Sequence, residues 1–97
     1  MTTEPKRIEL HLDSDPRLAA AAGGAVRLLA DTAGMPEEVS KEFQEATIRA
    51  CVEAFEAHPA ASHVVELLVF SDRLEVAVDP HAGSSAVRLS RSVVPLR

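Results

Sequence analysis

Three charged side chains stand at helical spacing in the middle of the chain: Arg49 lies four residues after Glu45 and four before Glu53. An α-helix would carry all three on one face. Such a face is either the remnant of a chemical site or a solvated charge ladder, which stabilises a helix by roughly 0.2–0.5 kcal/mol per pair. An arginine side chain stays protonated near neutral pH, so Arg49 cannot act as a general base.

The other side chains with catalytic or metal-binding potential do not form a known pattern. His58, His63 and His81 lack a zinc-ligand spacing, and we expect them in loops or on the surface. Cys51 stands in an apolar stretch and is expected to be a buried, inert thiol. The serines within residues 84–92 have no histidine and carboxylate at a spacing typical of a nucleophile. We therefore predict no catalytic residue and no metal site.

The overall composition restricts the class of protein. The 97 residues suit one domain spanning residues 1–97. A net charge of −5 and the absence of Tyr and Trp argue against nucleic-acid binding, which needs a basic surface and stacking aromatics. The single cysteine fits a reducing compartment, and no segment has the length and apolarity of a signal peptide or a membrane span. We expect a cytoplasmic protein that contacts neither nucleic acid nor membrane.

Hydrophobic periodicity divides the chain into strands and helices. Alternation predicts a half-buried strand, spacings of three and four predict two helices, and two apolar segments around a short turn predict a hairpin. The ranges are 7–13 (strand), 14–34 and 35–59 (helices), 62–80 (hairpin, turn at 71–73) and 86–94 (a further short strand). This order, β-α-α-β-β-(β), predicts an α/β two-layer sandwich, in which two helices cover one face of a mainly antiparallel sheet.

The first helix has signals for both of its ends and for its packing. Ser14 or Asp15 can cap its start, and Gly34 suits a left-handed residue after its end. Gly23 and Gly24 each cost about 1 kcal/mol relative to Ala in a helix, so they indicate close packing of another backbone. Its core-facing residues are expected to be Leu18, Ala22, Ala25 and Leu29. Those of the second helix are expected to be a stripe of Val39, Phe43, Ala46, Ala50 and Ala54, which Ile48, Cys51, Val52 and Phe55 widen.

Four segments between about residues 8 and 83 carry a resemblance to a known family. They are the strand-to-cap segment "IELHLDSDP", the helix junction "LADTAGMPEE", the helix "EATIRACVEAFEAH" and the hairpin arm "DRLEVAVDP". Their order and signals resemble the N-terminal half of the anti-sigma-factor serine kinases, which belong to the histidine-kinase-like ATPase superfamily. The resemblance implies that the second helix turns one face toward a nucleotide.

The positions that carry chemistry in that family are altered here. The family places a glutamate base and, four residues later, a magnesium-binding asparagine on the second helix, where this chain has Arg49 and Glu53. The family's Asp-x-Gly-x-Gly turn, whose aspartate binds adenine, corresponds to Asp79, His81 and Gly83, so that a histidine replaces the first glycine. Residues 84–97 contain no glycine for the family's phosphate loop. The resemblance therefore implies a degenerate, truncated nucleotide pocket without a cofactor.

Three hypotheses about function follow. The first is a non-catalytic regulatory domain that acts by protein binding or self-association. In that case the resemblance implies a sigma factor or its regulator as partner, and we expect a homodimer. The second is a minimal kinase that binds ATP with magnesium through Glu53 and Asp79. The third is an unrelated small α/β subunit of a larger assembly.

Overall fold

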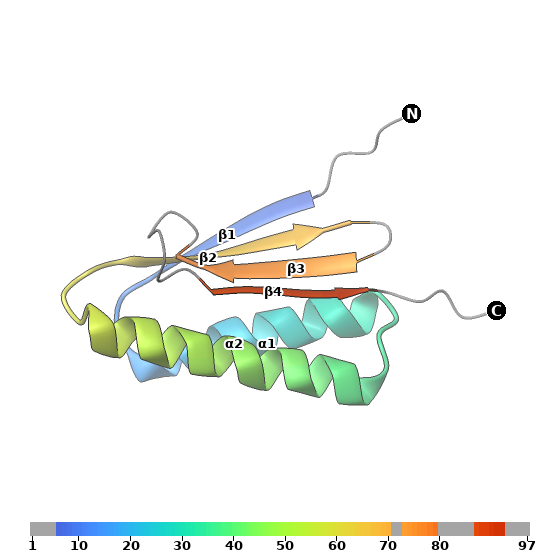
Figure 1. The fold of residues 1–97 in the computed structure, drawn as a ribbon, viewed down its shortest axis with the longest axis horizontal. Helices are drawn as coiled ribbons and strands as arrows, with labels where there is room; N and C mark the ends of the chain where they lie inside the picture. Colours follow the sequence, from blue (N-terminus) through green and yellow to red (C-terminus); the bar gives the residue numbers. More distant parts are fainter. Residues whose placement is uncertain (1–5, 71–72, 80–86, 93–97) are drawn as a thin grey trace.

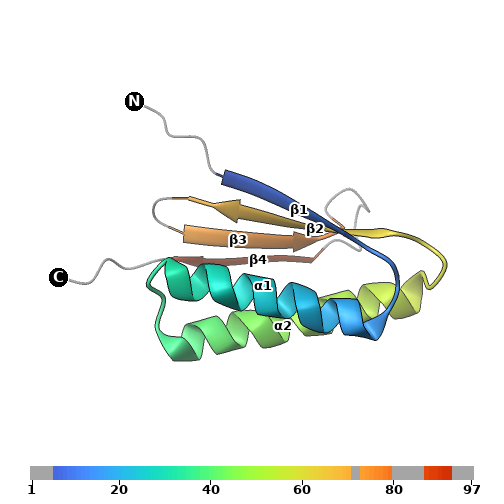
Figure 2. The same cartoon turned by 180° about the vertical axis from the view of Figure 1, so that it is seen from behind.

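The computed structural model describes residues 6–70 and 73–79 completely and residues 87–92 as backbone. The elements are β1 (Lys6–Leu12), α1 (Pro16–Thr32), α2 (Glu37–Ala57), β2 (His63–Val69), β3 (Arg73–Val78) and β4 (Val87–Ser92). The strands form one antiparallel sheet in the order β1-β2-β3-β4. Both helices cover the same face of this sheet (Figures 1 and 2). The predicted two-layer α/β sandwich is confirmed, including the short last strand.

The sheet follows from the alternation in β1 and from the hairpin of β2 and β3. Ile8 lies opposite Leu67 and Leu10 opposite Val65, so the apolar side chains of β1 point toward the helices. β1 pairs only with β2, and it is therefore an edge of the described sheet. The backbone N–H of Phe70 donates to the carbonyl of Arg73 over 2.9 Å. Arg73 thus begins β3, and its predicted place in the turn was wrong.

The helices begin and end where the local signals indicate. The Asp15 carboxylate accepts the backbone N–H of Arg17 over 2.9 Å, so Asp15 caps α1. Gly34 has φ 88°, which confirms the left-handed residue after α1. Met35 then donates its backbone N–H to the carbonyl of Ala30 over 3.1 Å and leads directly into α2. The junction is short, so the two helices pack antiparallel to each other (Figure 1).

The core-facing side of α1 is broader than the predicted one. Ala22 is buried, and Leu18 and Leu29 are half-buried and pack against the core, as expected, whereas Ala25 is half-buried and is not part of this packing. α1 packs against α2 as well as the sheet, and this double contact places its smallest side chains inside. The buried residues of α1 are Ala19, Ala22, Gly23, Val26 and Ala30. Those of α2 are Ser40, Phe43, Thr47, Ala50, Cys51 and Phe55, which confirms Phe43 and Ala50 from the predicted stripe and Cys51 and Phe55 from its predicted extension.

The two adjacent glycines of α1 have different surroundings. A Cβ atom at Gly23 would lie 2.4 Å from Cγ1 of Ile48 and 3.2 Å from the backbone oxygen of Gln44. α2 therefore approaches α1 closely at Gly23, as expected. A Cβ atom at Gly24 would meet nothing within 4 Å, so the expectation of close packing was wrong for Gly24.

In the described residues, neither helix is long and apolar enough to span a membrane.

Candidate functional site

Arg49 and Glu53, the altered positions of the expected nucleotide face, lie on the exposed side of α2. The buried residues Thr47 and Ala50 lie on the side of the helix that faces the core. Among the described residues, Arg49 makes no ion pair within 4.0 Å with Glu45 or Glu53. The three charges thus form a solvated stripe without a closed ion pair, and its contribution to stability is small.

Asp79, the position expected to correspond to the adenine-binding aspartate, holds the end of the hairpin together. Its Oδ1 accepts the backbone N–H of Val64 over 2.9 Å, and its Oδ2 lies 2.7 Å from Nδ1 of His63. Its own backbone N–H donates to the carbonyl of Val64 over 2.7 Å. An adenine amino group would therefore compete with two existing partners for this carboxylate. His81 and Gly83 lie outside the described residues.

Ser14, His63 and Asp79 form a chain of hydrogen-bonding side chains that the sequence analysis did not anticipate. Nε2 of His63 lies 2.9 Å from Oγ of Ser14, while its Nδ1 lies 2.7 Å from the Asp79 carboxylate. Oγ of Ser14 is also within hydrogen-bond distance of the carbonyl oxygens of His58 and Ala61, at 3.1 and 3.2 Å. A hydroxyl, an imidazole and a carboxylate in this order have the arrangement of a nucleophile, a base and a group that orients the base.

The number of available protons restricts the protonation states of the hydrogen-bonded side chains Ser14, His63 and Asp79. An ionised carboxylate only accepts hydrogen bonds, so Nδ1 of His63 must carry the proton that faces Asp79. In the neutral ring, Nε2 then accepts a hydrogen bond from the hydroxyl of Ser14 and faces the His58 carbonyl, a second acceptor, at 3.1 Å. In the imidazolium, Nε2 instead donates to the His58 carbonyl at 3.1 Å or to Ser14 Oγ. The neutral state is the one that could remove a proton from Ser14.

The topology brings these residues together because they lie at the ends of three neighbouring strands, β1, β2 and β3, on the same end of the sheet. Ser14 follows the end of β1, His63 begins β2, and Asp79 follows the end of β3. Leu12 pairs with His63, which places the end of β1 beside the start of β2. The hairpin register was the available signal: Val65 lies opposite Val78, so Asp79, the next residue of the second strand, lies beside Val64 and close to His63.

The imidazole of His63 is buried, so the prediction of a surface or loop histidine was wrong for this residue. His63 is 2% exposed, and its ring packs against the ring of Phe55, with 5.0 Å between the two ring centroids. Cys51 lies in the same interior, as predicted. Burial, and then the negative charge of Asp79, raise the pKa of the Cys51 thiol to about 11. This thiol is therefore unreactive near neutral pH.

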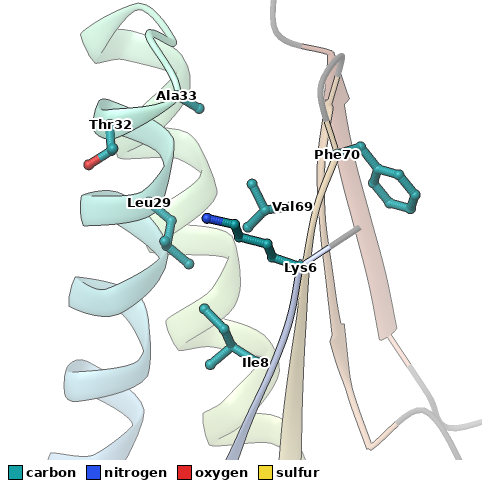
Figure 3. Close-up of a pocket in the computed structure, with 7 residues that line it drawn as sticks. All are labelled: Lys6, Ile8, Leu29, Thr32, Ala33, Val69 and Phe70. Carbon is teal, nitrogen blue, oxygen red and sulfur yellow. The ribbon is translucent and has the colours of Figure 1, made fainter. Parts of the chain in front are cut away.

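Two hollows formed by described residues open on the surface. One has a volume of about 220 Å³, and Ser14 lies in its wall. The other, of about 330 Å³, separates the first half of β1 from the end of α1. Figure 3 shows Ile8, Val69 and the stem of Lys6 extending from the sheet into this second hollow and Leu29 extending from α1. The first hollow is lined by Ser14, Pro16, Val52, Phe55, Glu56 and Pro59.

No set of three or more metal-binding side chains is grouped to hold an ion within residues 6–70 and 73–79. In comparisons with protein-family models and with curated proteins, no family model and no curated protein matches the chain.

Proposed function

We propose that this chain is a protein-interaction domain that pairs with a second copy of itself and performs no phosphoryl transfer. In this proposal it is a degenerate relative of the anti-sigma-factor kinases, located in the cytoplasm, and the dimer binds a sigma factor or a regulator of one. The resemblance of its segments and the preserved two-layer sandwich support this relationship. The edge strand β1 supports the self-association most directly.

The surface that carries the proposal combines an unpaired strand edge with exposed apolar side chains. Ile8 in β1 remains 37% exposed although it points toward the helices. It borders the 330 Å³ hollow, whose other apolar walls include Leu29 and Val69. An exposed strand edge is a template for pairing with another chain, and apolar surface beside it favours that pairing. We call β1 and this hollow the β1 surface.

The charges of β1 favour one antiparallel register with a second copy. If Ile8 lies opposite the partner's Ile8, Arg7 faces the partner's Glu9, and Glu9 faces the partner's Arg7. Opposite charges across a strand pair contribute roughly 0.2–1 kcal/mol each, and the low end applies here because Arg7 also pairs with Glu66 and Glu9 of its own chain. A register centred on Glu9 would instead place two carboxylates directly opposite each other, which is unfavourable. The chain is thus self-complementary about Ile8, as a two-fold symmetric dimer requires.

Arg49 and Asp79, the positions that correspond to the family's nucleotide site, argue against nucleotide chemistry. Arg49 is a permanent cation on an exposed helix face, so it offers neither a base nor a metal ligand. Both oxygens of the Asp79 carboxylate already have partners in the hairpin. These two positions are the ones through which the family would orient a nucleophile and hold adenine. We therefore assign the interaction role to the β1 surface and no catalytic role to Arg49 or Glu53.

Light scattering coupled to gel filtration tests this proposal. At tens of micromolar, the wild-type chain is expected to have the mass of a dimer. Ile8→Lys places a charge in the paired edge and is expected to give a monomer. The matched control is Leu28→Lys, because Leu28 in α1 is 67% exposed and does not line the hollow. A monomeric wild type, or a dimer that only Leu28→Lys disrupts, would refute pairing through β1.

A further inference from the structure

We infer that Ser14 is a nucleophile that His63 activates and that it accepts acyl groups from small activated carboxylic esters. This inference is independent of the interaction role. It concerns the end of β1 near Leu12, whereas the hollow of the β1 surface lies near the start of the strand. Its basis is the chain from Ser14 Oγ to His63 Nε2, at 2.9 Å, and from His63 Nδ1 to the Asp79 carboxylate, at 2.7 Å. A nucleophile within hydrogen-bond reach of a base that a third group orients is the signature of covalent catalysis.

The burial of the three groups suits their roles. His63 is 2% exposed and its ring packs against Phe55, so the base cannot rotate away from Ser14 without losing this packing. Asp79 is held by the backbone N–H of Val64 and keeps the proton of the ring on Nδ1. Ser14 itself is only partly buried and lies in the wall of the 220 Å³ hollow. Ser14 thus borders an open hollow, while the base is buried and the Asp79 side chain is 19% exposed.

The hollow determines the class of acyl group. Pro16, Val52 and Phe55 give it an apolar wall, and its volume of about 220 Å³ is enough for a short aliphatic chain. Glu56 adds a carboxylate to the same wall, which disfavours anionic substrates. We therefore expect neutral esters with short aliphatic acyl groups.

The reaction consumes one ester and one water. Ser14 Oγ forms a bond to the ester carbonyl carbon, and its proton passes to Nε2 of His63. The bond between that carbon and the leaving oxygen then breaks, and the leaving group takes the proton from Nε2. In the second half, Nε2 removes a proton from water, and the water oxygen forms a bond to the acyl carbon. The bond between that carbon and Ser14 Oγ then breaks, which releases the carboxylic acid, and Oγ takes the proton from Nε2. The ring of His63 ends each cycle neutral.

The surroundings of Ser14 limit the reaction to activated esters. The carbonyl oxygens of His58 and Ala61 lie 3.1 and 3.2 Å from Oγ, and carbonyls do not stabilise an oxyanion. At the start of α1, the N–H groups of Arg17 and Leu18 already donate to Asp15. Loss of one oxyanion donor costs about 10²–10³ in rate in a serine protease, so an ester with a good leaving group is required here.

Acylation by p-nitrophenyl acetate tests the inference on the wild-type chain. After an early acid quench, intact-mass and peptide mass spectrometry are expected to show one acetyl group on Ser14, with an initial burst of one equivalent of p-nitrophenol before turnover. Ser14→Ala should lower the initial rate by about 10²-fold or more, because general-base catalysis alone supplies that factor. The control is Ser62→Ala, since Ser62 is an exposed serine in the loop before β2. Acetyl groups on lysines only, or equal rates for Ser14→Ala and wild type, would overturn the assignment.

Asp79→Asn tests the positioning role of the carboxylate. An amide at this position can still accept the N–H of Val64, but its NH₂ group faces Nδ1 and forces the proton onto Nε2. The variant should remain folded by circular dichroism, lose acetylation of Ser14 and change the ring tautomer in ¹⁵N NMR spectra of His63. A folded variant with the changed tautomer and an unchanged acetylation rate would show that Ser14 does not use His63 as its base.

Discussion

The neighbouring residues Gly23 and Gly24 offer a sharp test of the helix packing. Replacing either residue by Ala removes the same conformational freedom from the unfolded chain and gives the same gain in helix propensity, about 1 kcal/mol. The two positions differ only in what the new methyl group meets. We therefore expect only Gly24→Ala to raise the free energy of unfolding.

The expected magnitudes follow from the contacts. At Gly23 the methyl carbon would lie 2.4 Å from Cγ1 and 2.7 Å from Cδ1 of Ile48, and 3.2 Å from the backbone oxygen of Gln44. Overpacking of this kind costs about 1–3 kcal/mol. Gly23→Ala should thus be neutral or destabilising by up to about 2 kcal/mol, whereas Gly24→Ala should stabilise by about 0.5–1 kcal/mol. For a domain of this size, each kcal/mol shifts Tm by about 4–8 °C.

Thermal and urea unfolding, followed by circular dichroism at one protein concentration, measure this difference. The Ile48→Ala background supplies the control, because it removes both of the side-chain atoms that lie too close to Gly23. In that background Gly23→Ala should stabilise the protein, which gives the two substitutions a coupling energy of about 1–3 kcal/mol. Equal effects of Gly23→Ala and Gly24→Ala in the wild-type background would refute the close contact between α1 and α2.

Three further predictions concern the interior and the altered pocket. Burial and the charge of Asp79 raise the pKa of Cys51 from 9.0 to about 11. The thiol therefore ionises at a lower pH in the unfolded chain than in the folded one. As a result, the free energy of unfolding falls as pH rises from about 9 to about 11. Urea titrations across this pH range should show a smaller decrease in the free energy of unfolding for Cys51→Ala than for the wild type. Asp79→Ala leaves the Val64 N–H and Nδ1 of His63 without their acceptor, and the free energy of unfolding should fall by about 2–4 kcal/mol in urea titrations. Millimolar ATP with magnesium should leave Tm unchanged, and a rise in Tm that Asp79→Asn abolishes would restore the nucleotide hypothesis.

Local patterns were sufficient to predict the elements of the fold. The alternation of Ile8, Leu10 and Leu12 predicts a strand with one apolar face, and the register with β2 confirms it. Asp15 and Gly34 mark the two ends of α1 because capping depends on neighbours within a few residues. These features are short-range, so a single sequence contains the information that determines them.

The features that the sequence analysis missed depend on long-range contacts. His63 was predicted at the surface because its partners, Ser14 and Asp79, are 49 and 16 residues away along the chain. Gly23 and Gly24 have the same local signal, and only the position of α2 distinguishes their environments. The roles of His81 and Gly83 stay predictions, because both residues lie outside the described part of the chain.

Disulfide cross-linking of Ile8→Cys tests the proposed pairing of two β1 strands most directly. Residues directly opposite each other in an antiparallel pair have Cα atoms about 4.5–5.5 Å apart, which is within the range for a disulfide. Cys51 is buried and its thiol has a raised pKa, so it should not compete for the new thiol. Under mild oxidation, Ile8→Cys is predicted to form a covalent dimer on non-reducing gels much faster than the exposed control Leu28→Cys. Equal rates for the two variants would contradict a dimer centred on Ile8.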